Sequence, residues 1–265
     1  MPDDTTPLVT VVTPVFNGES CLQTCIDSVR GQDCPGVEHI IVDGGSRDGT
    51  MDLVRAAGLR HLSERDAGIY DAMSKGVRLA RGDYVHILNA DDRYAGPQAL
   101  SRLVAALRDG DHDLVHARAR QVRADGSVVR EFGSHVSRAR LLRKMVVAHP
   151  TVVVRRAVYE RLGAFSVGFR IAADHEWVLR VWDRISVAYV PEALIEMQVG
   201  GVSTDNANVV RSYRESMAAA IMNGAVPLSA TVNCWYEIAK HWLFFRGLYA
   251  TPAAAPTPRR TPAGA

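Results

Sequence analysis

The sequence predicts an α/β protein with a mostly parallel, Rossmann-like sheet flanked by helices. Residues 8–15 and 38–42 are short, β-branched and almost wholly apolar, and each run is followed by residues with the apolar spacing of a helix. Strands buried on both faces, as in parallel sheets, have such continuous apolar runs. The alternation of strand and helix favours right-handed crossovers within one sheet.

The first half of the chain repeats this strand and helix unit. The expected strands cover 8–15, 38–42, 83–88 and 113–117, and the expected helices cover 19–30, 51–57, 68–80 and 98–108. Asn17-Gly18 ends the first strand, and a glycine-rich turn at 44–50 follows the second. These elements form a nucleotide-binding type of half over residues 8–117.

The second half, residues 118–226, is less regular. We expect a hairpin at 121–132 that turns at Asp125-Gly126, helices at 137–145, 157–162 and 173–183, and strands at 151–154, 186–190 and 194–198. We find no internal repeat and no linker before residue 250, so residues 1–226 are expected to form one domain.

The last segments differ in composition from this domain. Residues 227–250 combine Trp235, Tyr236 and Trp242 with Lys240 and Arg246, which predicts an amphipathic C-terminal helix. Such a helix either packs on the core or lies on a bilayer surface. Residues 251–265 are mostly Pro, Ala, Thr and Arg and are expected to be disordered.

Composition excludes several classes of function. The 265 residues are 47% hydrophobic, enough for a sizeable core, and the net charge of +2 with no basic, aromatic-interleaved stripe argues against nucleic acid. The four cysteines form no CxxC pair, which favours a reduced cytoplasmic protein. No stretch is long and apolar enough to predict a spanning helix or a secretory leader.

Two adjacent carboxylates, Asp91 and Asp92, follow the strand expected at 83–88 in the sequence Asn89-Ala90-Asp91-Asp92. Adjacent acids repel each other and are best tolerated beside a divalent cation. Ligands of open α/β sheets bind at the carboxyl ends of strands, which is where this pair stands. The structural alternative is a solvated turn that caps the following helix.

Three further acids have both a functional and a structural interpretation. Asp43, at the end of the second strand, suits a base N–H, although the turn after it lacks the G-x-G-x-x-G spacing and could simply cap a helix. Asp71 and Lys75 are four residues apart on a helix and form either a local ion pair or a sugar and diphosphate contact. Asp174 lies in a first helical turn, where it favours the helix dipole or acts as a general base.

Five motifs stand in the same order as in the family 2 glycosyltransferases with the GT-A fold, which this sequence resembles over about 9–203. They cover residues 11–17, 42–50, 66–73, 89–92 and 173–174. The Gly-Ile-Tyr-Asp-Ala-Met version at 68–73 is similar to the bacterial subgroup that decorates exopolysaccharides and mycobacterial glycolipids. Asn89 departs from the family, where many members have Asp, and His175-Glu176 replaces a pair that is commonly aromatic or aliphatic.

The resemblance implies a role for each matching residue. Donor contacts fall on Thr13, Pro14, Asn17, Asp43, Asp66, Asp71, Lys75, Asn89, Ala90 and Asp91, the ligands of Mn²⁺ or Mg²⁺ are Asp91 and Asp92, and the catalytic base is Asp174. The implied reaction moves a sugar, with inversion, from a nucleotide-diphosphate donor to a hydroxyl of a saccharide or lipid-linked acceptor. The half at 118–226 then serves the acceptor, and a lipid-linked acceptor implies peripheral contact with the inner face of the membrane.

Two rival functions use a similar sheet. A nucleotidyltransferase that makes sugar nucleotides favours a cationic loop after the first strand, and residues 16–19 carry no cation. A silent nucleotide-sugar-binding protein would be favoured by loss of an acid at position 91, 92 or 174, and all three acids are present. The donor sugar, the base, the acceptor and the oligomeric state are not assigned by the sequence.

Overall fold

The computed structural model describes residues 7–199 and 208–245. The tail expected to be disordered, 251–265, lies outside these described residues, as does the end of the expected C-terminal helix. Within them, no helix is long and apolar enough to cross a membrane. The four cysteines are free thiols, in keeping with the expectation of a reduced protein.

The N-terminal part of the sheet is parallel. Its strands are β1 (Val9–Val15), β2 (Val37–Asp43), β3 (Arg60–Ser63) and β4 (Tyr84–Ile87), with β1 between β2 and β4. Val9 pairs with both Val37 and Tyr84, so these three strands start at one level. Their carboxyl ends therefore meet at one edge of the sheet, where Val15 lies level with Asp43.

The remaining strands extend the sheet with mixed directions. They are β5 (Asp92–Tyr94), β6 (Leu114–Val122), β7 (Val128–Phe132), β8 (Val153–Arg155) and β9 (Val187–Gln198). The order over the described residues is β3-β2-β1-β4-β8-β6-β9-β5, with β7 paired to β6 as the expected hairpin. β8 is antiparallel to both β4 and β6, and β5 is antiparallel to β9.

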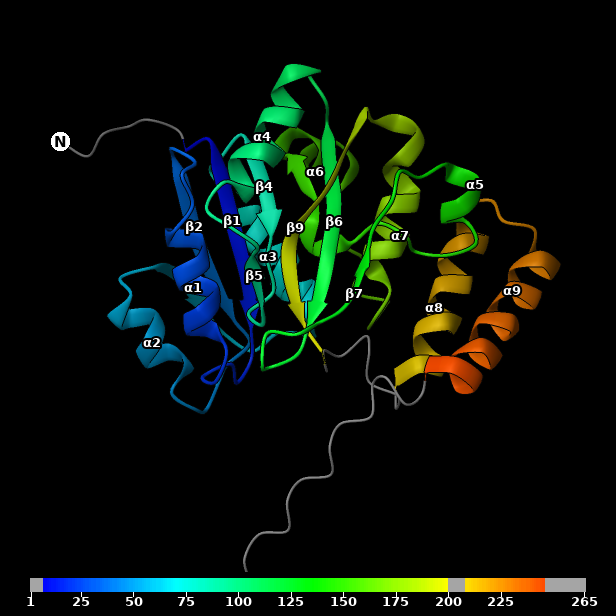
Figure 1. The fold of residues 1–265 in the computed structure, drawn as a ribbon, viewed down its shortest axis with the longest axis horizontal. Coiled ribbons are helices and arrows are strands. Elements are labelled where there is room, and N and C mark those ends of the chain that lie inside the picture. The colour runs from blue at the N-terminus through cyan, green and yellow to red at the C-terminus, as the bar shows by residue number, and fades with distance from the viewer. Residues whose placement is uncertain (1–6, 200–207, 246–265) are drawn as a thin grey trace, which may run out of the picture.

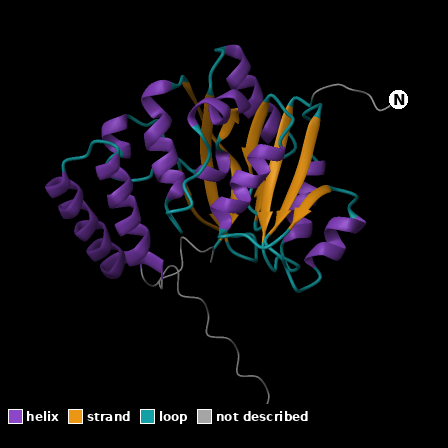
Figure 2. Cartoon of the chain, turned by 180° about the vertical axis from the view of Figure 1, so that it is seen from behind, coloured by secondary structure: helices purple, strands orange, loops and turns teal. Residues whose placement is uncertain are grey.

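Helices cover both faces of the sheet (Figures 1 and 2). The helices on one face are α1 (Leu22–Arg30), α2 (Thr50–Ala56) and α4 (Ala99–Asp109), and they pack on strand side chains such as Val11. The helices on the other face are α3 (Ile69–Leu79), α6 (Arg156–Leu162) and α7 (Ala173–Val181), and they pack on strand side chains such as Val12. Neighbouring residues such as Val11 and Val12 face different helices because successive side chains of a strand point to opposite faces of the sheet.

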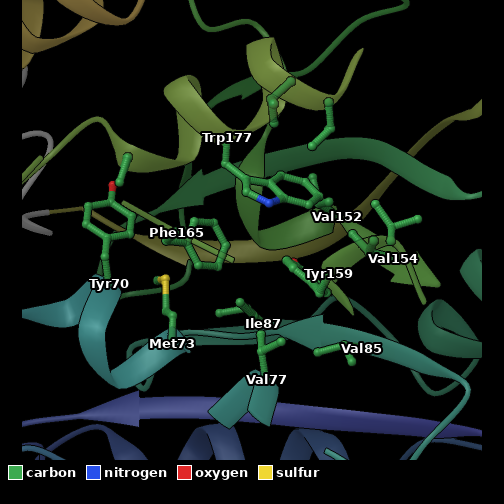
Figure 3. Packing of buried hydrophobic residues seen from close by; sticks show 14 of the residues in the cluster. Tyr70, Met73, Val77, Val85, Ile87, Val152, Val154, Tyr159, Phe165 and Trp177 are labelled. Carbon is green, nitrogen blue, oxygen red and sulfur yellow. The ribbon is translucent and has the colours of Figure 1, made fainter. Parts of the chain in front are cut away.

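An aromatic cluster joins α3, α6 and α7 (Figure 3). Trp177 of α7 is fully buried, donates its indole N–H to Gly163 O at 2.9 Å, and stacks on Tyr159 with ring centroids 4.8 Å apart. Phe165 lies between Trp177 and Tyr70, 5.8 Å from each ring. This packing fixes the start of α7 relative to α3, and both helix starts matter for the site described below.

The chain ends in a pair of packed helices at one end of the molecule (Figure 1). α8 (Val209–Met222) packs on α7, α9 (Pro227–Lys240) packs on α8, and one π-helical turn covers His241–Phe245. The short helix α5 (Arg138–Leu141) lies beside α7, and 3₁₀ turns cover His149–Thr151 and Trp182–Arg184. The predicted amphipathic helix thus exists over its described part.

The predicted fold class is confirmed, and the differences are local. Strands expected at 186–190 and 194–198 form one strand, β9, because its pairing with β6 continues past Pro191 through a register shift. The helix expected at 137–145 is only one turn long. β3 and α8 were not expected: β3 is a short polar edge strand, and α8 follows a segment without a clear helix start.

Candidate active site

A cleft of about 800 Å³ opens at the carboxyl edge of β1 and β4. Its walls come from the loop after β1, the start of α3, the turn between β4 and β5, the 144–150 segment, and the loop that leads into α7. The predicted site residues that line it are Pro14, Asn17, Asn89, Ala90, Asp91, Asp92 and Asp174. Residues separated by more than 150 positions in the sequence thus share one cavity of a size typical for ligand sites.

The loop after β1 is tied to the glycine-rich loop after β2. Asn17 has a φ of 51°, a left-handed conformation that Asn tolerates better than most residues. Its side-chain oxygen accepts from Arg47 N at 2.9 Å, and its backbone N–H donates to Ser46 Oγ at 2.7 Å. Thr13 is fully buried, with its hydroxyl 3.0 Å from His39 Nε2, and is absent from the described residues that line the cleft.

Asp43 organises the loop that follows β2. Its buried carboxylate accepts hydrogen bonds from the backbone N–H groups of Gly45 and Ser46 and from the hydroxyls of Ser46 and Ser63. These contacts give Asp43 a structural role within the turn, and its contact with a base stays a prediction. Asp66 lies over the same loop, because a Cβ added to Gly44 would stand 2.5 Å from Asp66 Oδ2.

Asp71 and Lys75 form the local ion pair that their spacing allows. Lys75 Nζ is 3.1 Å from Asp71 and 2.8 Å from Glu64, and its hydrogen bond to Glu64 raises the pKa of Lys75. Asp71 also accepts from Ala67 N at 3.1 Å. Neither side chain is among the described cleft-lining residues, so their sugar and diphosphate contacts stay predictions.

The tandem acids face the cleft from the turn that leads into β5. Asp92 is only 3% exposed and accepts from Asn89 Nδ2 at 2.9 Å. Burial, and then the charge of Asp91, raise the pKa of Asp92 well above its ordinary value, and burial also raises the pKa of Asp91. Asn89 Oδ1 is buried without a hydrogen-bond partner in the described chain.

These oxygen atoms fit a hard divalent cation. A cation would offset the mutual repulsion of the two carboxylates, and Mn²⁺ or Mg²⁺ prefers oxygen ligands. The described residues contain no group of three or more acidic, histidine or cysteine side chains suited to a metal. Asp91 and Asp92 could therefore hold the ion only together with substrate phosphates or water, an arrangement usual for Mg²⁺ sites.

Asp174 faces the cleft from the first turn of α7. Its Oδ1 accepts from the N–H of His175 at 2.8 Å and from the hydroxyl of Tyr70 at 3.1 Å. The Tyr70 hydroxyl also lies 2.6 Å from Ile171 O, so α3 is joined to the loop before α7 at this point. His149 borders the same cavity, and its burial lowers its pKa against the opposing effect of Asp174.

A carboxylate from α8 holds the same loop. Glu215 Oε2 accepts from the backbone N–H groups of Arg170, Ile171 and Ala172 at 3.0, 2.8 and 3.1 Å. Three donors on one oxygen fix the backbone two residues before Asp174.

The sequence interpretation did not assign Tyr70, His149 or Glu215 to the site. Tyr70 could have been found, since it stands inside the motif at 66–73, but nothing in the sequence pattern marks Glu215.

Known proteins resemble this chain in sequence. The sequence model described as Glycosyl transferase family 2 matches residues 10–163. A PGL/p-HBAD biosynthesis glycosyltransferase of Mycobacterium tuberculosis is 31% identical over 188 residues, covering 66% of this chain and 69% of the relative. An uncharacterized glycosyltransferase of the same organism is 34% identical over 179 residues, covering 66% and 68%.

Solved structures share the fold at low sequence identity. TarS of S. aureus (residues 1–349, in complex with UDP-GlcNAc) matches 90% of this chain and 74% of its own, with a TM-score of 0.68 and 17% identity. A mannosyltransferase of Pyrobaculum calidifontis in complex with GDP-Man and Mn²⁺ matches 91% and 76%, with a TM-score of 0.65 and 20% identity. At these identities the likeness concerns the fold alone.

Proposed function

The chain belongs to glycosyl transferase family 2, and from this premise we propose that it transfers a sugar, with inversion, from a nucleotide-diphosphate donor to an acceptor hydroxyl. The observation that carries the proposal is the shared cleft, in which Asp174 on one wall faces the same cavity as Asp91 and Asp92 on another. Separate acids for the leaving group and for the nucleophile are what a single displacement needs.

The donor occupies the part of the cleft between the loop after β1 and the tandem acids. Pro14 and Asn17 border the nucleotide, and Asn89 and Ala90 border the sugar diphosphate. A divalent cation held by Asp91 and Asp92 would supply charge neutralisation for the diphosphate leaving group. The GDP-Man and Mn²⁺ complex of the Pyrobaculum mannosyltransferase supports the pairing of a nucleotide-sugar donor with a divalent cation.

Asp174 acts as the general base. Its Oδ1 accepts hydrogen bonds from His175 N and from the Tyr70 hydroxyl, and its Oδ2 has no hydrogen-bond partner among the described residues. Oδ2 takes the proton of the acceptor hydroxyl, whose oxygen forms a bond to the anomeric carbon. The bond from that carbon to the diphosphate oxygen breaks on the opposite face, so the configuration inverts.

The acceptor is a saccharide or a lipid-linked molecule of glycolipid or polysaccharide biosynthesis. The name of the mycobacterial relative, which refers to PGL/p-HBAD biosynthesis, supports this class. The 144–150 segment, β7 and α8 also line the cleft and carry none of the proposed donor contacts, so we assign this side to the acceptor.

The test is Asp174→Asn with a panel of UDP-, GDP- and dTDP-sugars and Mn²⁺. Asn keeps the acceptor atom that bonds His175 N and removes the base, so donor affinity by calorimetry should be unchanged. Release of nucleotide from the preferred donor should fall about 10²–10⁴-fold. Asp183→Asn, an exposed acid just after the end of the same helix, is the matched control. Wild-type turnover in Asp174→Asn would remove this residue from the mechanism.

A further inference from the structure

An exposed apolar stripe runs along α9 and the turn after it. We define the α9 stripe as Leu228, Val232, Trp235, Tyr236, Trp242 and Leu243, which are between 43% and 75% exposed. Their spacing of three, four and seven residues places them on one helical face. A row of large apolar side chains of this length is rarely left in water, and it marks an interaction surface.

The stripe is not needed to pack the helix on the rest of the protein. Ala230, Cys234 and Ile238 lie on the opposite face of α9 and are buried. That face packs on α8, which packs on α7, so α9 is the outermost helix at its end of the molecule (Figures 1 and 2). The stripe therefore points away from the domain over its described part.

The elements that adjoin α9 carry excess positive charge. Arg140, Arg143, Arg211 and Arg214, on or next to α5 and α8, form no ion pair within the described chain. The two acids of α8 and α9 already have partners. Glu215 accepts hydrogen bonds from backbone N–H groups, and Glu237 forms ion pairs with Lys144 and Lys240. The remaining sequence, 246–265, carries three arginines and no acid. An apolar face at the end of the molecule that carries excess positive charge complements an anionic bilayer.

A second cavity lies next to the catalytic cleft at this end of the molecule. It measures about 230 Å³ and lies between α8, α9 and the 142–145 segment. Its apolar walls include Leu142, Met217 and Ala230, and it shares Lys144 and Met145 with the catalytic cleft. Ala230 and Cys234, which line this cavity, belong to the buried face of α9, so the cavity lies behind the stripe and beside the catalytic cleft.

We propose that the α9 stripe docks the enzyme on an anionic lipid bilayer, with Trp235 and Tyr236 at the level of the headgroups. Trp and Tyr prefer that level because their rings are apolar and their N–H and O–H groups stay hydrated. The docking itself is independent of turnover, and the inference that it brings the cleft close to a lipid-linked acceptor rests on the proposed function.

The test is flotation of the full chain with vesicles of phosphatidylcholine, with and without phosphatidylglycerol. The chain should float with the anionic vesicles, less with the neutral ones, and less again at high salt. Val232→Glu should lower the bound fraction about tenfold, since membrane partitioning scales with buried apolar area. Val167→Glu is the matched control, because Val167 is 63% exposed and Val232 is 62% exposed. It should float like the wild type.

Three results would overturn the proposal. The first is failure of the chain to float, and the second is an equal loss in both valine variants. The third is a concentration-dependent dimer in light scattering that Val232→Glu abolishes, which would assign the stripe to a second copy of the chain. Leu228→Glu repeats the test if Val232→Glu unfolds at a lower temperature. Donor hydrolysis without vesicles should match the wild type in every stripe variant, so loss of docking is distinguished from loss of the transferase.

Discussion

Tyr70→Phe removes one oxygen atom at the point where α3 meets the loop before α7. The hydroxyl of Tyr70 is 2.6 Å from Ile171 O and 3.1 Å from Asp174 Oδ1, and the side chain is buried. Burial, and then the charge of Asp174, raise the pKa of Tyr70 well above its ordinary value, so it remains a donor at neutral pH. Tyr70 is a positioning residue in this scheme, since it acts through Asp174.

The size of the effect follows from these contacts. Loss of a buried hydrogen bond that leaves a carbonyl without a partner costs about 1–2 kcal/mol. For a chain of this length the melting temperature should fall by about 3–6 °C. Asp174 keeps the bond from His175 N and loses its link to α3, so we expect kcat to fall about tenfold, as for a small displacement of a catalytic group.

The assay compares Tyr70→Phe with Tyr159→Phe by thermal unfolding, donor calorimetry and nucleotide release. Tyr159 belongs to the same aromatic cluster, where its ring stacks on Trp177, but its hydroxyl does not contact Asp174. The control should keep the wild-type kcat, and both variants should keep donor affinity. Equal kcat values for the two variants would refute the positioning of Asp174 by Tyr70.

Three further perturbations test separate parts of the structure. Asp92→Ala should weaken donor binding more than tenfold (about 1.4 kcal/mol) in calorimetry with Mn²⁺ and leave metal-free binding unchanged; equal losses in both would exclude a metal role. His86 is fully buried, and this burial lowers its pKa to about 4. The neutral ring therefore stabilises the fold at pH values above the ordinary pKa of histidine, and this stability is lost as the pH falls toward 4. The difference in urea-unfolding free energy between the wild type and His86→Gln should fall by about 2 kcal/mol from pH 7 to pH 5, and a difference that does not change with pH would contradict it. Gly44→Ala should displace the Asp66 carboxylate and weaken donor binding about fivefold with little loss of stability, measured by calorimetry and thermal unfolding, whereas unchanged affinity would separate Asp66 from the donor.

The part of the fold that the sequence predicts well is the part with strong local patterns. β1 and β2 are continuous apolar runs, and their observed ends differ from the expected ones by at most one residue. β3 escaped prediction because Arg60-His61-Leu62-Ser63 has neither an apolar run nor a clear alternation; it is a strand because it pairs with β2. Such edge strands depend on tertiary context rather than on local preference.

The candidate site also has a part that the sequence predicts and a part that it does not. The order of motifs predicts that Asn89 to Asp92 and Asp174 share a cleft, and the structure brings them to one cavity. The motif residue Lys75 instead turns toward Glu64, because a helix side chain points where its nearest opposite charge and its rotamer allow. Sequence spacing places a residue on an element, but the direction of its side chain depends on neighbours far along the chain.

The triple hydrogen bond of Glu215 has a consequence for recombination of such enzymes. Because this single carboxylate on α8 anchors the backbone just ahead of Asp174, α8 and the 170–172 segment form one structural unit. A chimera that imports foreign terminal helices to change its target without their matching 170–172 segment would mismatch this anchor. An exchange of α8 and α9 between family members therefore requires a crossover point upstream of residue 170.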